Sequence, residues 1–354
     1  MANYPYPTLE VNLAAVTHNY NLLAKRNNCA AVVKANGYGL GISAIAPTLY
    51  EAGCREFFVA NLEEGIELRN IFSDNDIRDN LIYVFHGVRK NQAQDFIAND
   101  IIPVINNPIQ FENWQNAGKY ALHVDTGMCR LGYEPQAAKK LQNDKNICLL
   151  ISHLACADEP EHKKNAEQLT LFKELRKYFP NVRASLANSA GAMLKEDYYF
   201  DLLRPGCALY GISPNKNSKE FMNVVNLSAP VLQYTELAKN QTIGYGATKM
   251  LKKGAIIATL EIGYADGFMR SLSNNISGYV NSFEVPLVGR VSMDMVTVDV
   301  SNLPKNLLND NLRISFINDL QSVNKFADLS DTIGYEIFTK IGNRVKRIYK
   351  NNFY

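Results

Sequence analysis

Residues 31–41, AVVKANGYGLG, join an apolar, β-branched run that ends at Lys34 to a loop too rich in glycine to continue a strand. This run starts at residue 30, and seven similar runs follow at residues 56–60, 81–86, 102–105, 120–125, 148–153, 183–188 and 202–210. Short apolar strands that alternate with helices pair in parallel, because each parallel connection needs a crossover. Eight strands in roughly 200 residues favour a closed (βα)8 barrel of the TIM type over an open doubly wound sheet. No Gly-x-Gly-x-x-Gly fingerprint follows the first run.

The composition and periodicity of the sequence change after Gly211. Residues 214–219, PNKNSK, have the composition of a polar linker, and helical periodicity mostly ends there. Further on, Val296, Val298 and Val300 alternate with more polar neighbours, as in an antiparallel strand with one buried face. We therefore expect a barrel domain over residues 9–222 and a mainly antiparallel β domain over residues 223–354, with residues 1–8 as a segment that could pack with it.

Composition restricts the classes of function. The chain has 354 residues, 47% hydrophobic and 20% charged, which is ordinary for a globular protein of two domains. A net charge of +2 without basic runs argues against nucleic acid as a partner. The six cysteines include no Cys-x-x-Cys pair, so we predict reduced thiols and no metal site. No basic and apolar leader and no apolar stretch of about 20 residues is present, so we expect a cytoplasmic protein without membrane contact.

Several reactive side chains fall at the ends of the predicted strands, where a barrel carries its active site. Taken singly, each has an ordinary structural explanation: a solvated lysine, a core histidine, a surface arginine or a helix-capping serine. Together they predict one site at the barrel mouth, formed by Lys34, Arg130, His153, Ser189 and Arg204.

Glycine-rich turns near Ser189 and Gly206 follow the seventh and eighth runs. Their free backbone N–H groups predict a phosphate cradle at the place where barrels often hold one. A phosphate site beside a lysine suited to Schiff-base chemistry predicts pyridoxal 5'-phosphate as cofactor.

The chain resembles the alanine racemase family in a series of ordered motifs that covers nearly its whole length. The motifs are AVVKANGYGLG, HVDTGMCRLG, ISHLACADE, ANSAG, RPGCALYGISP, IGYGAT, IGYADG and GRVSMDMVTVDV. The resemblance implies a barrel followed by a β domain, and interconversion of L-alanine and D-alanine. It also implies supply of D-alanine for the peptidoglycan of the cell wall, or the reverse catabolic direction.

The resemblance implies a two-base mechanism, since racemisation removes the α-proton from one face and returns it to the other. Lys34 resembles the lysine that binds the cofactor and acts on the D-amino-acid face. Tyr245 resembles the opposing base, supplied by the partner subunit of a homodimer with shared sites. Arg204 resembles the donor to the pyridine nitrogen, and His153 would position Arg204 and Tyr245.

The remaining site residues are also carried over from the family motifs. Positions that match the cofactor-binding set, besides Lys34 and Arg204, are Tyr38, Asn188, Ser189, Gly206 and Cys207. Arg130 and the backbone of Met293 match the groups that hold the substrate carboxylate, and Asp294 is expected to support the loop of Met293. Tyr264, Arg270 and Arg290 match positions that line the entrance and favour a small side chain.

Three positions depart from the family pattern. His123 stands where many members have a lysine that becomes carboxylated and hydrogen-bonds to the arginine at Arg130, so either another anion or a different arrangement is expected there. Leu40 replaces a common histidine, and Asn343 replaces a tyrosine found in some members.

Three alternative functions share part of this sequence pattern. A racemase of broader range would act on serine or larger amino acids. A decarboxylase of similar architecture is disfavoured by Arg204, and a non-catalytic pyridoxal phosphate carrier is disfavoured by Tyr245 and the second domain. The expected partners are therefore a small amino acid and a second copy of the chain.

Overall fold

The protein is described by a computed structural model that covers residues 5–114, 117–215, 218 and 220–351. Val16–Met222 forms one compact unit, and the segments before and after it together form a second. Residues 9–15, which the sequence pattern placed in the barrel, belong to the second unit. Lys216, Asn217 and Lys219 of the expected linker lie outside the described residues.

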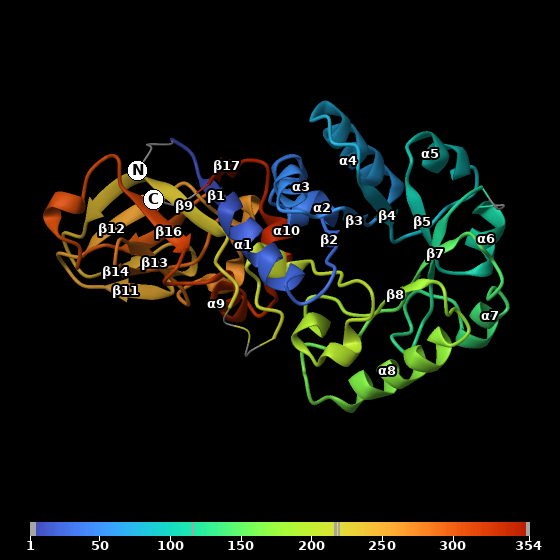
Figure 1. Ribbon diagram of the computed structural model, residues 1–354. Helices are drawn as coiled ribbons and strands as arrows, with labels where there is room; N and C mark the ends of the chain where they lie inside the picture. The colour runs from blue at the N-terminus through green and yellow to red at the C-terminus, as the bar shows by residue number, and fades with distance from the viewer. Residues whose placement is uncertain (1–4, 115–116, 216–217, 219, 352–354) are drawn as a thin grey trace. The chain divides into compact units, whose positions relative to one another are not determined.

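The first unit contains a curved sheet of seven parallel strands in sequential order (Figure 1). They are β2 (Ala31–Val32), β3 (Glu56–Val59), β4 (Leu81–Val84), β5 (Ile102–Ile105), β6 (Tyr120–His123), β7 (Ile147–Ile151) and β8 (Arg183–Ser185). Residues 201–205 close the ring, because Ala30 donates to the Leu203 carbonyl and Asp201 to the Ala184 carbonyl, both at 2.9 Å. The predicted (βα)8 barrel fold is thereby confirmed.

The eighth run ends earlier than the sequence indicated. Residues 202–205 are extended, whereas Cys207–Tyr210 forms a 3-10 turn, η3. The turn follows Gly206, whose φ of −125° and ψ of −80° redirect the chain. The apolar side chains of η3 are buried, which explains why they looked like a continued strand.

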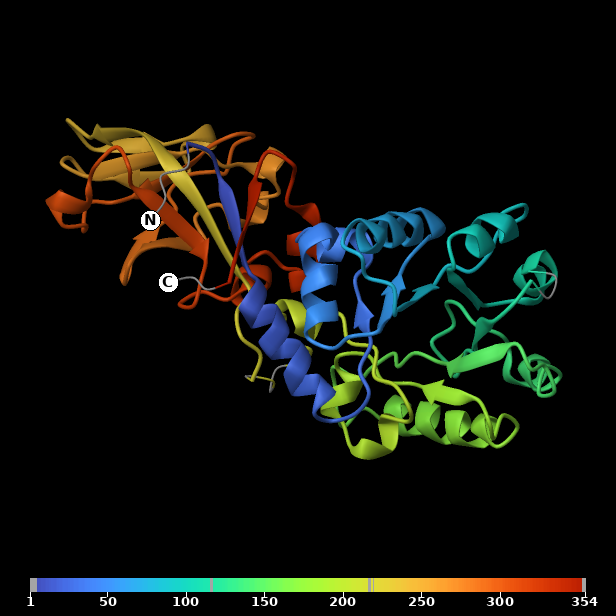
Figure 2. The same ribbon diagram turned by 45° about the horizontal axis from the view of Figure 1, so that its top comes forward.

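Helices follow most strands and lie outside the sheet, as the blue, teal and green ribbons of Figure 2 show. They are α2 (Lys34–Tyr38), α3 (Ile42–Glu51), α4 (Leu62–Asp74), α5 (Ala93–Ala98), α6 (Pro108–Trp114), α7 (Pro135–Lys139) and α8 (Lys163–Arg176). After β8 come the 3-10 turns η1 (Gly191–Met193) and η2 (Glu196–Tyr198). The barrel interior is filled by one apolar cluster that includes Val32, Phe58, Tyr83, Val104, Ala121, Ile151 and Leu202.

The second unit is mainly antiparallel β structure. Its largest sheet has the core order β14-β13-β16-β9-β1-β17, and β12 joins β9 to β15. The strands are β1 (Thr8–Asn12), β9 (Val225–Glu236), β12 (Ile256–Leu260), β13 (Ser277–Val280), β14 (Phe283–Pro286), β15 (Val296–Asp299), β16 (Arg313–Ile317) and β17 (Lys346–Lys350). Among the described strands of this unit, β1 and β17 alone pair in parallel. Val296 and Val298 are buried while Thr297 and Asp299 are partly exposed, as their alternation predicts.

Smaller elements complete this unit. A two-stranded sheet consists of β10 (Gln241–Ile243) and β11 (Lys249–Leu251). Its short turns are η4 (Tyr245–Ala247), η5 (Tyr264–Asp266), η6 (Arg270–Leu272) and η7 (Lys305–Leu307), and its helices are α9 (Val323–Leu329) and α10 (Gly334–Lys340). Helix α1 (Leu13–Ala24) runs from the end of β1 into the first unit. None of the described helices is long and apolar enough to cross a membrane.

Candidate active site

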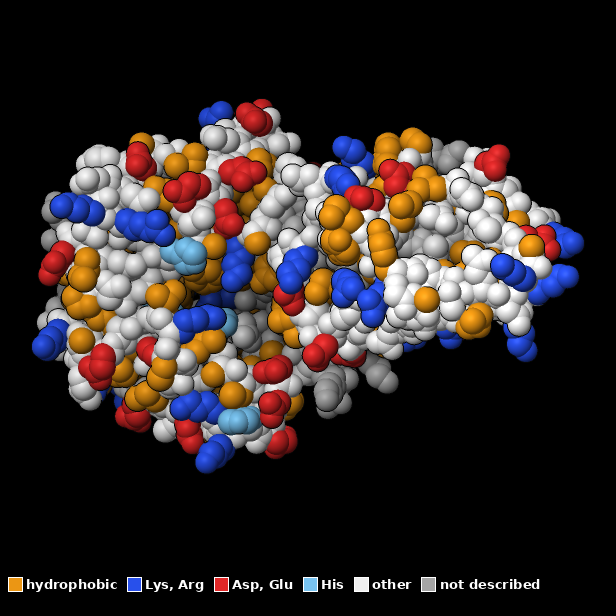
Figure 3. All heavy atoms as spheres, turned by 180° about the vertical axis from the view of Figure 1, so that it is seen from behind, with side chains coloured by type: hydrophobic (Ala, Val, Ile, Leu, Met, Phe, Trp, Pro, Cys, Tyr) orange, Lys and Arg blue, Asp and Glu red, His pale blue; other side chains and the backbone are white. Residues whose placement is uncertain are grey.

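The barrel mouth carries a ring of side chains that strand geometry predicts. Side chains alternate across a strand, so the residue two positions after an inward-facing core residue also faces the interior, one layer nearer the strand end. Applied to the core cluster, this rule gives the mouth ring: Lys34, Ala60, Phe85, Asn106, His123, His153 and Arg204. Figure 3 shows positive and imidazole side chains gathered around a hollow on the unit drawn at the left.

Lys34 begins a turn in which five consecutive residues have positive φ, from Ala35 at 53° to Gly39 at 81°. Such left-handed backbone is unfavourable outside glycine, so the turn needs external support. Glu64 provides it by accepting the Ala35 N–H at 2.8 Å and the Ala60 N–H at 2.7 Å. The lysine therefore projects from a fixed backbone.

The electrostatic setting of Lys34 favours its neutral amine. Burial lowers the pKa of Lys34, the Arg130 charge lowers it further, and the Glu64 carboxylate acts in the opposite sense. Its Nζ lies 6.0 Å from the centre of the Phe85 ring. A lysine with a depressed pKa is a better nucleophile and a better base near neutral pH than a solvated one.

Tyr38, Ser189, Gly206 and Cys207 come together beside Lys34. Ser189 Oγ accepts from the backbone N–H of Gly206 at 2.9 Å and of Ala208 at 3.3 Å. Gly206 meets Tyr38 so closely that a Cβ at residue 206 would lie 2.2 Å from the tyrosine Oη. Backbone amides, a serine and a tyrosine hydroxyl around a bare glycine suit a phosphate group.

Asn188 lies in the same segment, but its side chain serves the local backbone. Its Oδ1 accepts the N–H of Gly191, the first residue of η1, at 2.8 Å. Its carbonyl accepts the Ala192 N–H at 2.9 Å, so the backbone N–H is the group that Asn188 can offer to a cofactor.

Arg204 is 3% exposed and is held by neutral acceptors. Its Nη1 donates to Ser185 Oγ and its Nη2 to the Ser152 carbonyl. Burial lowers the pKa of Arg204 to about 9, so the guanidinium remains charged at neutral pH. Within the described part of the chain no carboxylate forms an ion pair with it, so its remaining N–H donors are available to a ligand.

The two histidines of the mouth ring are neutral at physiological pH. Burial, reinforced by the Arg204 and Arg130 charges, lowers the pKa of His123 to about 4. The same causes hold the pKa of His153 well below its ordinary value. The mouth thus combines permanent cations with uncharged imidazoles, an environment suited to an anionic ligand.

Arg130 stands on a loop shaped by the Asp125 carboxylate. That carboxylate accepts the backbone N–H groups of Gly127, Met128 and Cys129, each at 2.8 Å. Cys129 adopts a φ of 57° within the loop. Arg130 itself is exposed and forms no ion pair among the described residues, so its charge is available to a carboxylate.

The other predicted residues lie in the second unit. Tyr245 is 73% exposed on η4, between Gly244 and Gly246, whose φ values are 67° and 73°. The Arg290 guanidinium packs on this turn, since a Cβ at Gly246 would lie 3.0 Å from its Nη1. The tyrosine hydroxyl is thereby presented outward on a rigid, glycine-flanked turn.

Tyr264, Met293 and Asp294 occupy two joined loops of the second unit. The Ser292 carbonyl accepts the Tyr264 N–H at 3.0 Å, and the Met293 carbonyl accepts the Ala265 N–H at 2.9 Å. Arg344 links Asp294 to Asp266, with 2.8 Å ion pairs to each carboxylate. Asp294 therefore acts on its loop through Arg344.

Arg270 belongs to the same group of loops. The Arg270 carbonyl accepts a hydrogen bond from Ser273 Oγ at 2.6 Å. Ser273 Oγ in turn accepts the Val291 N–H at 3.0 Å. The departures Leu40 and Asn343 are, respectively, buried and exposed.

Sequence reasoning missed the residues that support the site. Asn106, Ser152 and Ser185 each bind a side chain of the mouth ring, and Glu64 binds the backbone of Ala35, which follows Lys34. Asn106 could have been found, because it follows the core residue Val104 by two positions. The other three depend on contacts between distant segments that no local pattern shows.

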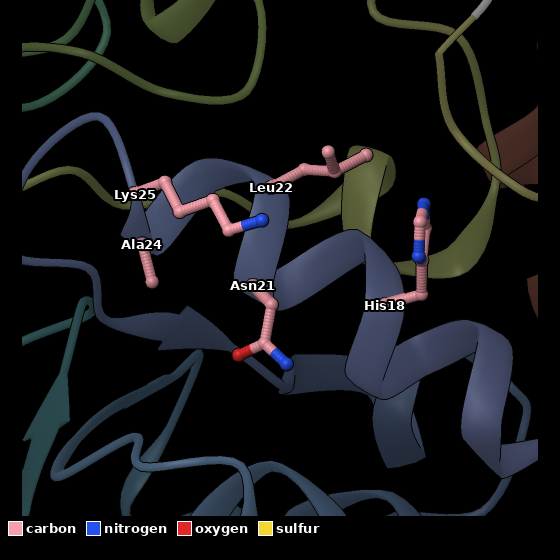
Figure 4. A pocket seen from close by; sticks show the side chains of 5 residues that line it. All are labelled: His18, Asn21, Leu22, Ala24 and Lys25. Carbon is pink, nitrogen blue, oxygen red and sulfur yellow. The ribbon is translucent and has the colours of Figure 1, made fainter.

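Other possible sites offer less chemistry. The described residues contain no group of three or more His, Cys, Asp or Glu side chains that could hold a metal. One pocket follows α1 and is lined by His18, Asn21, Leu22, Ala24 and Lys25 (Figure 4). All of its lining comes from one helix and the residue after it, and none belongs to the mouth ring.

Comparison with protein families identifies the chain. The model of the alanine racemase N-terminal domain matches residues 11–214, and that of the alanine racemase C-terminal domain matches residues 224–349. The chain belongs to the alanine racemase family. The family resemblance seen in the sequence motifs is thus confirmed.

Individual members of the alanine racemase family are similar over nearly the whole chain. The alanine racemase of Rickettsia rickettsii is 42% identical, covering 97% of this chain and 98% of that protein. The crystal structure of alanine racemase from Bartonella henselae, with covalently bound pyridoxal phosphate, is 35% identical with a TM-score of 0.88, covering 98% and 99%. The biosynthetic alanine racemase of Pseudomonas aeruginosa is 32% identical with a TM-score of 0.87, covering 98% and 100%.

Proposed function

We propose that the protein is a pyridoxal phosphate-dependent alanine racemase, an isomerase that interconverts L-alanine and D-alanine. The observation that carries the proposal is the match to both domains of this family, combined with a mouth ring that includes a half-buried lysine and a buried arginine. The Rickettsia and Bartonella relatives support alanine over a broader range of substrates.

The residues of the barrel mouth fit pyridoxal phosphate. Lys34 would bind the cofactor covalently, and Ser189, Tyr38 and the backbone of Asn188, Gly206 and Cys207 would hold its phosphate. The close approach of Tyr38 to Gly206 supports this, because only a glycine leaves the backbone open there. Arg204 would donate to the pyridine nitrogen, since a guanidinium has donors and no acceptor. When bound, the cofactor withdraws electrons from the substrate's α-carbon and makes its α-proton acidic.

Lys34 and Tyr245 would then move the proton. The depressed pKa of Lys34 lets its amine accept the α-proton on one face near neutral pH. The exposed Tyr245 hydroxyl would serve the opposite face, from the partner subunit of a homodimer. His153, kept neutral beside Arg204, would position Arg204 and Tyr245 without adding a charge.

Arg130 and the backbone of Met293 would bind the substrate carboxylate. The free charge of Arg130 supports this assignment, as does the loop that Asp125 holds in place. Tyr264, Arg270 and Arg290 would line the entrance and restrict it to a small side chain. The joined loops that carry them give these side chains a fixed backbone.

The cellular role follows from the activity. We propose that the enzyme supplies D-alanine for peptidoglycan in the cytoplasm. All six cysteines are free thiols in the structure, which agrees with a reducing compartment.

Chiral product analysis tests the activity. The cofactor-loaded protein is incubated separately with L-alanine, L-serine, L-lysine and L-arginine, and each product is resolved into enantiomers. D-alanine formation well above the other products is expected. Comparable turnover of the larger substrates would replace the proposal with a broad racemase, and carbon dioxide release would replace it with a decarboxylase.

Complementation tests the shared site. The Lys34→Ala and Tyr245→Ala variants are expected to be inactive alone. If each site takes Lys34 from one subunit and Tyr245 from the other, the mixed dimer holds one intact site, and a refolded equimolar mixture recovers about a quarter of the wild-type activity. No recovery in a mixture that forms mixed dimers would argue against shared sites.

A further inference from the structure

Asn106 and His123 stand side by side in the mouth ring. Strands β5 and β6 pair in parallel with Ile105 opposite Leu122, so the next residue of each strand continues the same register. Both side chains follow inward-facing core residues by two positions, Val104 and Ala121. Asn106 Oδ1 and His123 Nδ1 lie 2.7 Å apart.

The orientation of the Asn106 amide is fixed by its other contacts. Its Nδ2 donates to the carbonyl oxygens of Phe85 at 2.9 Å and Val104 at 2.8 Å, and also approaches Gln110 Oε1 at 3.1 Å. A flipped amide would point its oxygen at these three acceptors, which is repulsive. Oδ1 must therefore face the histidine.

This orientation decides the tautomer of His123. An amide oxygen only accepts, so the His123 proton must be on Nδ1. Nε2 of the neutral ring then carries a lone pair and can only accept. The Arg204 and Arg130 charges near the ring oppose a second proton, and the one nearby carboxylate, Asp125, is engaged by three backbone N–H groups.

We propose that Asn106 and His123 form a positioning pair for Arg130, in which Asn106 fixes the proton on Nδ1 and His123 Nε2 accepts a hydrogen bond from the Arg130 guanidinium. The inference rests on the proposed function, in which Arg130 binds the substrate carboxylate. A neutral acceptor orients the guanidinium without cancelling its charge. No additional anion beside Arg130 is then required.

The Asn106→Asp variant tests the pair kinetically. Aspartate still accepts from Nδ1, but its charge stabilises the imidazolium, which turns Nε2 into a donor facing Arg130. One neighbouring carboxylate raises the pKa of His123 from about 4 to at most about 7. We therefore expect the KM for alanine to rise as pH falls below 7 and to reach about ten times the wild-type value near pH 6, the effect of losing one hydrogen bond to a charged group, with a smaller change in kcat. As pH rises and the imidazolium loses its proton, the KM should return toward the wild-type value.

Asn107→Asp is the matched control. It adds the same charge one residue away, where Asn107 Oδ1 caps the next helix by accepting the Gln110 N–H at 2.9 Å. Aspartate caps a helix as well as asparagine does, so KM should be unchanged. An equal KM in the two variants at pH 6 would overturn the positioning role.

Nitrogen-15 NMR of histidine-labelled holoenzyme tests the pair without relying on turnover. The chain has five histidines, and the spectrum of His123→Gln assigns the resonance of interest. We expect a proton on Nδ1 alone at pH 7, and an Nε2 shift that moves in Arg130→Met. A proton on Nε2, or no effect of Arg130→Met, would refute the inference even if alanine is racemised. Absence of racemisation with these shifts as expected would refute the proposed function alone.

Discussion

The Glu64 carboxylate accepts the backbone N–H of Ala35 at 2.8 Å and thereby holds the residue that directly follows Lys34. Its second oxygen accepts the Ala60 N–H at 2.7 Å, so one side chain joins the loops after β2 and β3. Ala35 and the next residue, Asn36, have left-handed backbone conformations, with φ of 53° and 54°. Each such non-glycine residue costs roughly 1 kcal/mol or more, and Glu64 offsets part of that cost.

The Glu64→Ala variant should lose stability and cofactor affinity together. Two backbone N–H groups lose their acceptor, so we expect the free energy of unfolding to fall by about 2 kcal/mol. Urea denaturation of the cofactor-free protein measures this loss. The Glu64→Gln variant keeps one amide oxygen as acceptor, so its free energy of unfolding should lie between those of Glu64→Ala and the wild type. An unchanged unfolding midpoint in Glu64→Ala would show that the left-handed turn supports itself.

The Gly206→Ala variant should bind pyridoxal phosphate poorly. A Cβ there would lie 2.2 Å from Tyr38 Oη and 2.8 Å from its Cζ, so the ring or the backbone must move. We expect the cofactor dissociation constant to rise at least about fivefold, since overpacking typically costs about 1–3 kcal/mol. Absorbance titration of the cofactor-free variant gives the constant. Wild-type affinity would mean that the phosphate does not depend on this close approach.

The charge of Arg130 should control the reactivity of Lys34. Because Arg130 lowers the pKa of Lys34, Arg130→Met should raise it, and less neutral amine will be present at a given pH. The pH dependence of the rate at which the cofactor-free protein condenses with pyridoxal phosphate should therefore shift to higher pH. Arg130→Lys keeps the charge and is the control. A shift in both variants would indicate a steric cause.

The stability of the protein should fall in mild acid because of His123. Its pKa is about 4 in the folded protein and about 6.5 in an unfolded chain, so the unfolded state binds more protons between these values. The contribution is complete above pH 6.5 and is lost as pH falls toward 4. Urea denaturation over this range should show a smaller slope with pH in His123→Phe. A slope equal to that of the wild type would mean that His123 is protonated in the folded state.

The Tyr245→Phe variant should separate chemistry from folding. The side chain is 73% exposed, so removing its hydroxyl should change the free energy of unfolding by less than about 0.5 kcal/mol. Single-turnover exchange in deuterium oxide should be lost preferentially from L-alanine, because Lys34 would serve the D face. Equal loss from both enantiomers would contradict this division of roles between the two bases.

The sequence was sufficient for the barrel because each strand is a short apolar run with its own boundary signals. The ends of the elements were less predictable. Residues 207–210 are apolar because η3 is buried, and burial alone does not distinguish a turn from a strand. Residues 9–15 looked like the start of the barrel, yet β1 pairs with β9 and β17.

The candidate site shows the same division. Lys34 could be placed at the mouth because it ends an apolar run, and Arg204 because it lies in one directly before Pro205 and Gly206. Ser152 and Ser185, which hold Arg204, could not be recognised, since β7 and β8 bring them to it from distant parts of the sequence. The Nδ1 proton of His123 depends on an amide whose orientation is set by three further acceptors, and only the folded structure reveals that.

The position of β1 has a consequence for synthesis on the ribosome. It lies between β9 and β17 in one sheet, although the whole barrel separates it from both along the chain. During translation β1 emerges first and must remain unpaired until Val225–Glu236 and Lys346–Lys350 have been made. The barrel can fold as a separate domain during this time, whereas the large sheet cannot be completed until the last part of the chain has been made. A fragment starting at residue 223 would therefore lack the strand that joins β9 to β17, and would leave one edge of β9 and all of β17 unpaired.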